Sequence, residues 1–178
     1  MKVVILLRGI NVGSTRSLPM RELTDILESI GFENVRTYIQ SGNVVADAPR
    51  AGLTALGDKI GTAIEEKKRF RPSILILTVE EFRLAMSTNP FPEAEADPSR
   101  LHLFFLDSTP ESPNLASMDA VKTHTERYVL DGKVMYFHAP DGMGNSRLGA
   151  NAERYLGVAA TARNWRTVVK LSDMAGLP

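Results

Sequence analysis

The sequence contains no cysteine among its 178 residues. A chain without cysteine cannot form a disulfide, a thiolate nucleophile, an iron–sulfur cluster or a cysteine-ligated zinc site. Neither sign of charge is in excess, since 21 lysines and arginines balance 21 aspartates and glutamates. Broad binding to a phosphate backbone depends on an excess of basic side chains that releases counterions, so the composition argues against a histone-like role.

Long hydrophobic runs are also lacking. The apolar run near the start, residues 3–7, has five members and ends at Arg8. Such a run is too short for a membrane span or for the apolar part of a signal peptide. We therefore expect a cytoplasmic protein with no membrane partner. A chain of this length buries roughly 70% of its unfolded surface, so it should fold unaided as one domain or two small ones.

The first eighty residues predict the element order strand, helix, strand, strand, helix, strand. Residues 3–7 form an unbroken apolar run, which is typical of a strand covered on both faces. One helical pattern follows Pro19 and stops at Gly31, and a second begins at Leu53 and leads into the charged run 65–69. The other strands are expected at 35–39, 44–45 and 74–77. This order is that of the split βαβ unit of the ferredoxin-like fold.

The same order recurs after a linker. Thr78 and Glu81 form a capping box that predicts a helix, and residues 92–100 are rich in proline, alanine and acids, as expected at a domain boundary. Beyond it we expect a strand at 101–106, a helix at 114–122, a hairpin at 127–138 that turns at Asp131-Gly132, a helix at 148–156, a strand at 158–162 and a helix at 164–175. Only the order of elements suggests a duplication, because identity between the halves is low.

We therefore predict an α+β fold of two ferredoxin-like (βαββαβ) halves with antiparallel sheets, plus a C-terminal helix. The expected domains are 1–79 for the first half, 80–100 for a helix and linker, and 101–178 for the second half with the C-terminal helix. The first and fourth strands are apolar on both sides, so the sheet face opposite the helices must be covered. The other half, the helix that begins near Glu80 and a second copy of the chain are the candidates.

The loop at residues 8–18 is the first candidate site. It is about twice the usual length for a strand-to-helix connection, and long ordered loops tend to be functional. It ends at a helix N-terminus, which attracts anions; Gly9 and Gly13 would let a ligand approach the backbone, and Arg8 and Arg16 add positive charge. The spacing matches neither the Walker motif nor the dinucleotide fingerprint. A structural loop with Arg8 in an ion pair is the competing interpretation.

Topology should bring further polar residues to the same edge. In a split βαβ unit the first two strands run parallel, so this loop should lie near the tip of the following hairpin. In the second half, residues 141–147 and 163–166 should share an edge in the same way. We expect the two edges to face one another across an interdomain cleft that binds an anionic small molecule, such as a nucleotide or a sugar phosphate. The predicted ligand-binding residues are Arg8, Asn11, Ser14, Tyr38, Gln40, Asn43, Ser146, Arg147, Arg163 and Asn164.

No catalytic residue and no cofactor follow from the sequence. His102, His124 and His138 are scattered, without a second ligand at metal-binding spacing, so we predict no metal site. No G-x-S-x-G elbow is present and no histidine lies near a candidate serine, which argues against a hydrolase triad. Whether the protein is an enzyme stays open.

Five motifs follow one another in a recognisable order. They are Leu7-Arg8-Gly9-Ile10-Asn11-Val12-Gly13, Pro19-Met20, Thr37-Tyr38-Ile39-Gln40-Ser41-Gly42-Asn43-Val44, Asn89-Pro90-Phe91 and Thr161-Ala162-Arg163-Asn164-Trp165-Arg166-Thr167. The chain closely resembles the bacterial domain of unknown function 1697 family over nearly its whole length. The resemblance implies an α+β chain of two related parts, and the family has no established activity, substrate or cofactor to carry over to this chain. Relatives have Arg and Lys where this chain has Asn145 and Arg147, so Arg147 retains one of the two charges.

Two other functions remain alternatives to the anionic ligand. A protein-interaction module would receive a partner on a sheet face or edge, and the ten acids against four bases in residues 80–131 would suit a basic partner. A module for single-stranded nucleic acid is less favoured, because Tyr38 is the one aromatic residue of the first hairpin and could stack on few bases. The sequence does not decide the oligomeric state.

Overall fold

The computed structural model describes residues 1–13 and 15–177 of the chain. They form two compact units: Met1–Leu84 together with Lys170–Pro178, and Ala85–Val169. Compared with the predicted ranges 1–79, 80–100 and 101–178, the first unit extends into the following helix and also includes the C-terminal segment. The division of the chain into the three predicted domains therefore remains a prediction.

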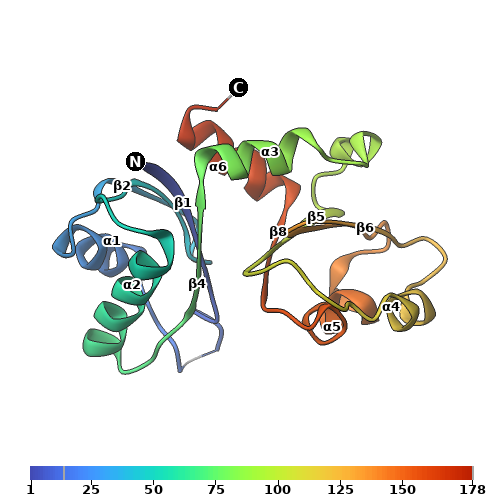
Figure 1. The fold of residues 1–178 in the computed structure, drawn as a ribbon, viewed down its shortest axis with the longest axis horizontal. Coiled ribbons are helices and arrows are strands. Elements are labelled where there is room, and N and C mark those ends of the chain that lie inside the picture. Colours follow the sequence, from blue (N-terminus) through green and yellow to red (C-terminus); the bar gives the residue numbers. More distant parts are fainter. Residues whose placement is uncertain (14, 178) are drawn as a thin grey trace. The chain divides into compact units, whose positions relative to one another are not determined.

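The first unit has the predicted βαββαβ order (Figure 1). Its elements are β1 (Lys2–Arg8), α1 (Met20–Ser29), β2 (Glu33–Tyr38), β3 (Asn43–Asp47), α2 (Leu53–Lys68) and β4 (Ser73–Thr78), and α3 (Val79–Ser87) begins directly after β4. The sheet has the strand order β2-β3-β1-β4, with every neighbouring pair antiparallel. This is the strand order of a ferredoxin-like sheet, so the predicted fold class is confirmed for this half.

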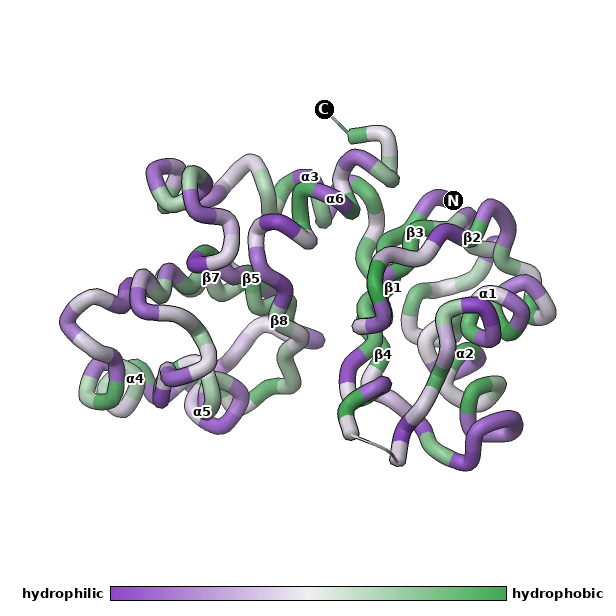
Figure 2. The backbone as a smooth tube through the Cα atoms, turned by 180° about the vertical axis from the view of Figure 1, so that it is seen from behind, coloured by the Kyte–Doolittle hydropathy of each residue, from purple (hydrophilic) through white to green (hydrophobic). Residues whose placement is uncertain are grey.

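The core of the first unit lies between its sheet and its first two helices. Both α1 and α2 cover the same face of the sheet in Figure 1. Val3, Ile5 and Leu7 of β1 pack into this core, and Val4 and Leu6, on the other face, are fully buried too. The prediction that β1 is covered on both faces is therefore correct, and β1 stands out as hydrophobic in Figure 2.

The second unit repeats the same topology. Its elements are η1 (Pro92–Ala96), β5 (Leu101–Leu106), α4 (Leu115–Val121), β6 (Arg127–Asp131), β7 (Val134–His138), η2 (Met143–Asn145), α5 (Arg147–Leu156) and β8 (Ala160–Asn164); α6 (Trp165–Ala175) begins in this unit and ends in the first. The strand order β6-β7-β5-β8 corresponds strand by strand to the first sheet. Phe104, Met135 and Phe137 of the sheet pack with Leu148 and Leu156 of α5.

Two sequence predictions need correction. The last strand, expected at 158–162, lies at Ala160–Asn164. Gly157 adopts a left-handed φ of 74° and ends α5. Residues 158–159 then form the connection to the strand. The expected linker 92–100 contains the short helix η1, whose Ala94 is buried. Among the residues that the structure describes, no helix is long and apolar enough to cross a membrane.

Candidate functional site

Asn11 is the residue that holds the loop at 8–18 together. Its Oδ1 accepts the Leu18 backbone N–H at 2.8 Å, and its Nδ2 donates to the carbonyls of Leu18 at 2.9 Å and Gln40 at 2.7 Å. Its own backbone N–H donates to the Arg16 carbonyl at 2.9 Å. The predicted proximity of this loop to the hairpin tip is thereby confirmed. Because both side-chain polar atoms of Asn11 are engaged, Asn11 positions the loop.

The clasped loop carries its charge on an arginine pair. Arg8 and Arg16 are both exposed. Gly9 has a φ of 75°, and a Cβ added there would lie 3.1 Å from Nη1 of Arg16, so the missing side chain leaves space for that guanidinium. Arg16 has no acidic partner within the part of the chain that the structure describes. The predicted Ser14 lies outside the described residues.

The tip of the β2–β3 hairpin packs tightly against the end of β1. The Leu7 N–H donates to the Gly42 carbonyl at 2.8 Å, and a Cβ on Gly42 would lie only 2.6 Å from Cβ of Leu7. Asn43 is fully buried, and its Nδ2 donates to the Tyr38 carbonyl at 3.1 Å and to Oγ of Ser41 at 2.8 Å. Asn43, predicted to bind a ligand, therefore has its amide group committed to closing the turn.

Ile39 completes this edge in an unusual conformation. Its φ of 48° is left-handed, which is strained for a β-branched side chain. Its side chain is 53% exposed, and Val12 in the clasped loop is 73% exposed. Tyr38 is half-buried and Gln40 is exposed. We call the set Arg8, Val12, Arg16, Tyr38, Ile39 and Gln40 the loop–hairpin edge.

Two of the predicted second-half residues cap helices. Oγ of Ser146 accepts the Gly149 N–H at 2.8 Å at the start of α5, and Ser146 is buried. Oδ1 of Asn164 accepts the Thr167 N–H at 3.0 Å at the start of α6. Small polar residues satisfy the free N–H groups of a first helical turn in this way. Both side chains therefore serve as helix caps.

The two remaining predicted residues of the second half are arginines. Arg147 is exposed at the first position of α5. Arg163 is partly buried in β8, and its desolvation lowers the pKa of its guanidinium to about 10. The predicted meeting of first-half and second-half residues in one cleft stays a prediction.

The predicted shared edge in the second half is confirmed. His138 at the end of β7 and Asn164 at the end of β8 pair with neighbouring residues at the start of β5. Sequence reasoning missed Arg100, which precedes β5 at this edge. Its Nη1 lies 2.4 Å from where a Cβ of Gly142 would be, so Arg100 occupies the space that this glycine leaves open.

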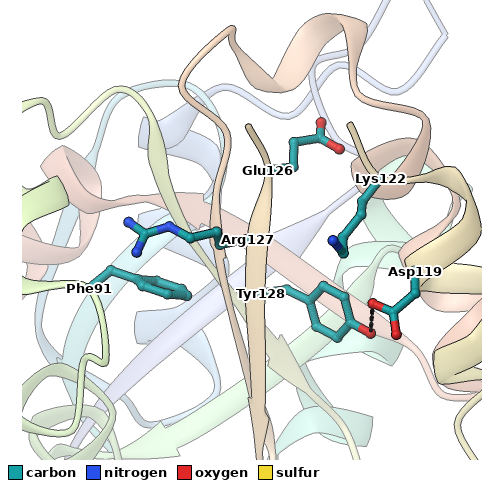
Figure 3. A pocket seen from close by; sticks show the side chains of 6 residues that line it. All are labelled: Phe91, Asp119, Lys122, Glu126, Arg127 and Tyr128. Atoms are coloured by element: carbon teal, nitrogen blue, oxygen red, sulfur yellow. Dashed lines mark hydrogen bonds between the residues drawn. The ribbon is translucent and has the colours of Figure 1, made fainter. Parts of the chain in front are cut away.

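A pocket beside the edge strand β6 was also missed from the sequence. It has a volume of about 410 Å³ and is lined by Phe91, Asp119, Lys122, Glu126, Arg127 and Tyr128 (Figure 3). Three segments supply these residues: the turn before η1, the end of α4 with the turn after it, and the start of β6. The family motif Asn89-Pro90-Phe91 was the one available signal, because Asn89 holds the backbone of Phe91 through both its amide atoms.

An arginine stacked on an aromatic ring forms one wall of this pocket. The Arg127 guanidinium lies 4.7 Å from the centre of the Phe91 ring, pairs with Glu93, and lies 3.1 Å from Nδ1 of His138. The hydrogen bond from Arg127 lowers the pKa of the Glu93 carboxyl. Burial, followed by the charge of Arg127, lowers the pKa of His138. The cluster therefore favours the neutral form of His138 and holds Arg127 in place.

The opposite wall contains a neutral tyrosine. The Tyr128 hydroxyl donates to Oδ1 of Asp119 at 3.1 Å. Burial, together with this hydrogen bond, raises the pKa of Tyr128 to about 12. Within the described part of the chain, no group of three or more histidine, aspartate or glutamate side chains could hold a metal ion.

A family model with the description "Protein of unknown function (DUF1697)" matches residues 1–136. The chain belongs to this family. The match includes the clasped loop, the first hairpin and the Asn89-Pro90-Phe91 motif, so the resemblance seen in the sequence is confirmed. The comparison with curated proteins finds no match.

A solved structure supports the same fold. The chain is similar to the conserved bacterial protein SP0830 from Streptococcus pneumoniae, with a TM-score of 0.75, 22% sequence identity and coverage of 98% of each chain. At this identity the likeness shows the fold alone. It confirms the α+β architecture of two βαββαβ halves with a C-terminal helix.

Proposed function

We propose that the loop–hairpin edge binds an anionic small molecule with a phosphate group, such as a nucleotide or a sugar phosphate. The observation that carries the proposal is the Asn11 clasp, which joins residues 8–18 to the hairpin tip. The sequence of these two segments, 8–18 and 37–45, contains two arginines and no acidic residue. An anion here would meet positive charge on a fixed backbone and no repelling carboxylate within either segment.

The geometry of the loop supports an anion in two further ways. The absence of a side chain at Gly9 leaves the Arg16 guanidinium room close to the loop backbone. An arginine also offers a planar fork of N–H donors that suits phosphate oxygens. The exposed side chains of Gln40 and Tyr38 would contribute neutral contacts from the hairpin.

Burial of Phe104, Tyr136 and Phe137 disfavours single-stranded nucleic acid. Phe104 and Phe137 of the second sheet pack into the core of that unit, and the Tyr136 hydroxyl donates to the Ala85 carbonyl at 2.8 Å. Stacking on successive bases needs aromatic rings on an accessible surface. Among the first-unit strands, only Tyr38 offers such a ring in part.

Thermal unfolding with a panel of nucleotides, sugar phosphates and a short RNA tests the proposal. A ligand present at 100 times its dissociation constant adds about 2.7 kcal/mol, which raises the unfolding temperature by roughly 5 to 10 °C for this chain length. We expect Arg8→Ala and Arg16→Gln to abolish the shift and the control Arg50→Gln, another exposed arginine of the first unit, to keep it. The absence of any shift, or a shift that survives both edge substitutions, would refute the proposal.

Exposed apolar side chains favour a protein partner as the second candidate. Val12 and Ile39 place two such side chains beside the arginines, a combination that suits an acidic peptide with an apolar residue. Selection of displayed peptides on the wild type and on Ile39→Asn tests this function, because asparagine tolerates the left-handed backbone while removing the apolar contact. Acidic–apolar peptides that bind only the wild type would favour the interaction module.

A further inference from the structure

We propose that the pocket beside β6 is a separate binding site for a small zwitterion of the amino-acid type, with one ammonium and one carboxylate group. The site lies within the second unit and shares no residue with the loop–hairpin edge. Its lining carries two acids, two bases and two aromatic rings, so its own formal charge is zero. A neutral ligand with separated charges matches that lining better than a simple anion or cation does.

Glu126 supplies the group for the ammonium. The residue is only 5% exposed, and its Oε2 accepts the Thr123 backbone N–H at 2.9 Å. The other carboxylate oxygen has no hydrogen-bond partner in the described part of the chain, and the residue lines the pocket. That oxygen is not among the buried side-chain atoms that lack a partner, so solvent reaches it, and a ligand ammonium would take the place of water there.

Lys122 supplies the group for the carboxylate. The side chain is partly buried at the end of α4 and makes no ion pair with any residue that the structure describes. In Figure 3 its amine points into the region beside Tyr128, below Glu126. Arg127, the other cation of the lining, is already held by Glu93, His138 and the Phe91 ring. Lys122 is therefore the base that remains available to a ligand.

The acidic and basic side chains of the pocket lining do not pair with one another. The lining acids Asp119 and Glu126 form no ion pair with the lining bases Lys122 and Arg127, although all four surround one cavity. Asp119 is instead engaged by the Tyr128 hydroxyl. A ligand whose ammonium meets Glu126 and whose carboxylate meets Lys122 would complete both interactions at once. The Tyr128 ring, fixed by Asp119, would then contact the rest of the ligand.

The size of the cavity agrees with a small metabolite. Its volume of about 410 Å³ falls at the lower end of small-molecule sites, about 300–1,000 Å³. Such sites combine apolar walls with a few convergent polar groups, as the Phe91 and Tyr128 rings do here with Glu126 and Lys122.

Titration of the wild-type protein with each of the twenty free α-amino acids, followed by amide NMR shifts, tests the proposal. We expect at least one to saturate with a dissociation constant below about 10 mM and to shift the signals of the turn at 122–128. Its desamino acid and its primary amide, which each lack one charge, should bind at least about tenfold more weakly. If no amino acid binds, or if both analogues bind as tightly as the parent, the proposal is overturned.

Matched substitutions locate the site. Lys122→Met and Glu126→Gln should each weaken binding at least about tenfold, whereas the exposed controls Lys133→Met and Glu111→Gln should not change it. Glu126→Gln retains an acceptor for Thr123, and the ligand analogues give the answer even if this variant folds poorly. Amino-acid binding that is unchanged by Lys122→Met places the site elsewhere and refutes the assignment. Arg16→Gln, which tests the proposed function, should leave this binding unchanged.

Discussion

Replacing Asn11 with alanine should destabilise the first unit more than any ordinary surface substitution. The change removes three side-chain hydrogen bonds of 2.7 to 2.9 Å, each with a net contribution of about 1 kcal/mol. One of them satisfies the N–H of Leu18, a fully buried residue. Alanine is also less stable than asparagine at a φ of 53°, which adds about 1 kcal/mol. The expected loss is therefore about 3 to 4 kcal/mol.

Asn34 provides a matched control for this experiment. It also has a left-handed backbone, with a φ of 52°, but its side chain makes one exposed hydrogen bond, to Asp47 at 2.8 Å. Asn34→Ala shares the backbone penalty and should cost about 1 to 2 kcal/mol. The difference between the two variants, about 2 kcal/mol, measures the clasp itself.

Urea unfolding followed by circular dichroism gives both free energies, and amide exchange reports on the Leu18 N–H. We expect Leu18 to lose its protection in Asn11→Ala and to keep it in Asn34→Ala. If the two variants lose the same stability within about 0.5 kcal/mol, or if Leu18 exchange is unchanged, Asn11 is not a clasp and the reasoning is wrong.

Three further predictions follow from single contacts. Ser146→Ala should cost about 1 kcal/mol in urea unfolding, because the cap of α5 is lost. Gly42→Ala should cost about 1 to 3 kcal/mol more than Gly132→Ala, since both glycines have a positive φ but only Gly42 lacks room for a Cβ. Ultraviolet titration should give Tyr128 a pKa of about 12, with a lower value in Asp119→Asn. An unfolded tyrosine ionises near pH 10, so the stability from this pKa difference is present below about pH 10 and is lost as the pH rises toward 12.

Each of these three predictions has a result that would contradict it. A Ser146→Ala variant as stable as the wild type would show that water replaces the cap. Equal losses in the two glycine variants would mean that the hairpin tip relaxes away from β1. A tyrosine that titrates near pH 10 in the folded protein would show that the Tyr128 hydroxyl is well solvated.

The order of elements was predictable because it depends on local patterns. Apolar spacing located α1 and α2, and the capping box of Thr78 and Glu81 predicted the start of α3, where the structure has both of the expected hydrogen bonds. The strand pairing then followed from the known topology of a split βαβ unit. The start of β8 was missed by two residues, because alanine, valine and threonine there fit a strand or a connection equally well.

The roles of polar side chains were much harder to predict. Asn11, Asn43, Ser146 and Asn164 were chosen for their chemistry, and the structure shows each of them bonded to nearby backbone. Asparagine and serine satisfy turns and helix ends as readily as they bind ligands, so residue type does not separate the two uses. The β6 pocket was missed for a different reason: apart from the Asn89-Pro90-Phe91 motif, its residues come from three segments with no common spacing.

The tie between the end of α6 and the first sheet has a consequence for synthesis of the chain. Nζ of Lys2 donates to the Ala175 carbonyl at 3.1 Å, and Arg36 donates to the carbonyl of Met174. A ribosome releases residues 2–84 long before residues 170–175, because the whole second unit is made in between. The first unit therefore lacks this segment until residues 85–169 have been made and residues 170–175 follow them. Joining residue 175 to residue 2 and opening the chain elsewhere would remove that delay.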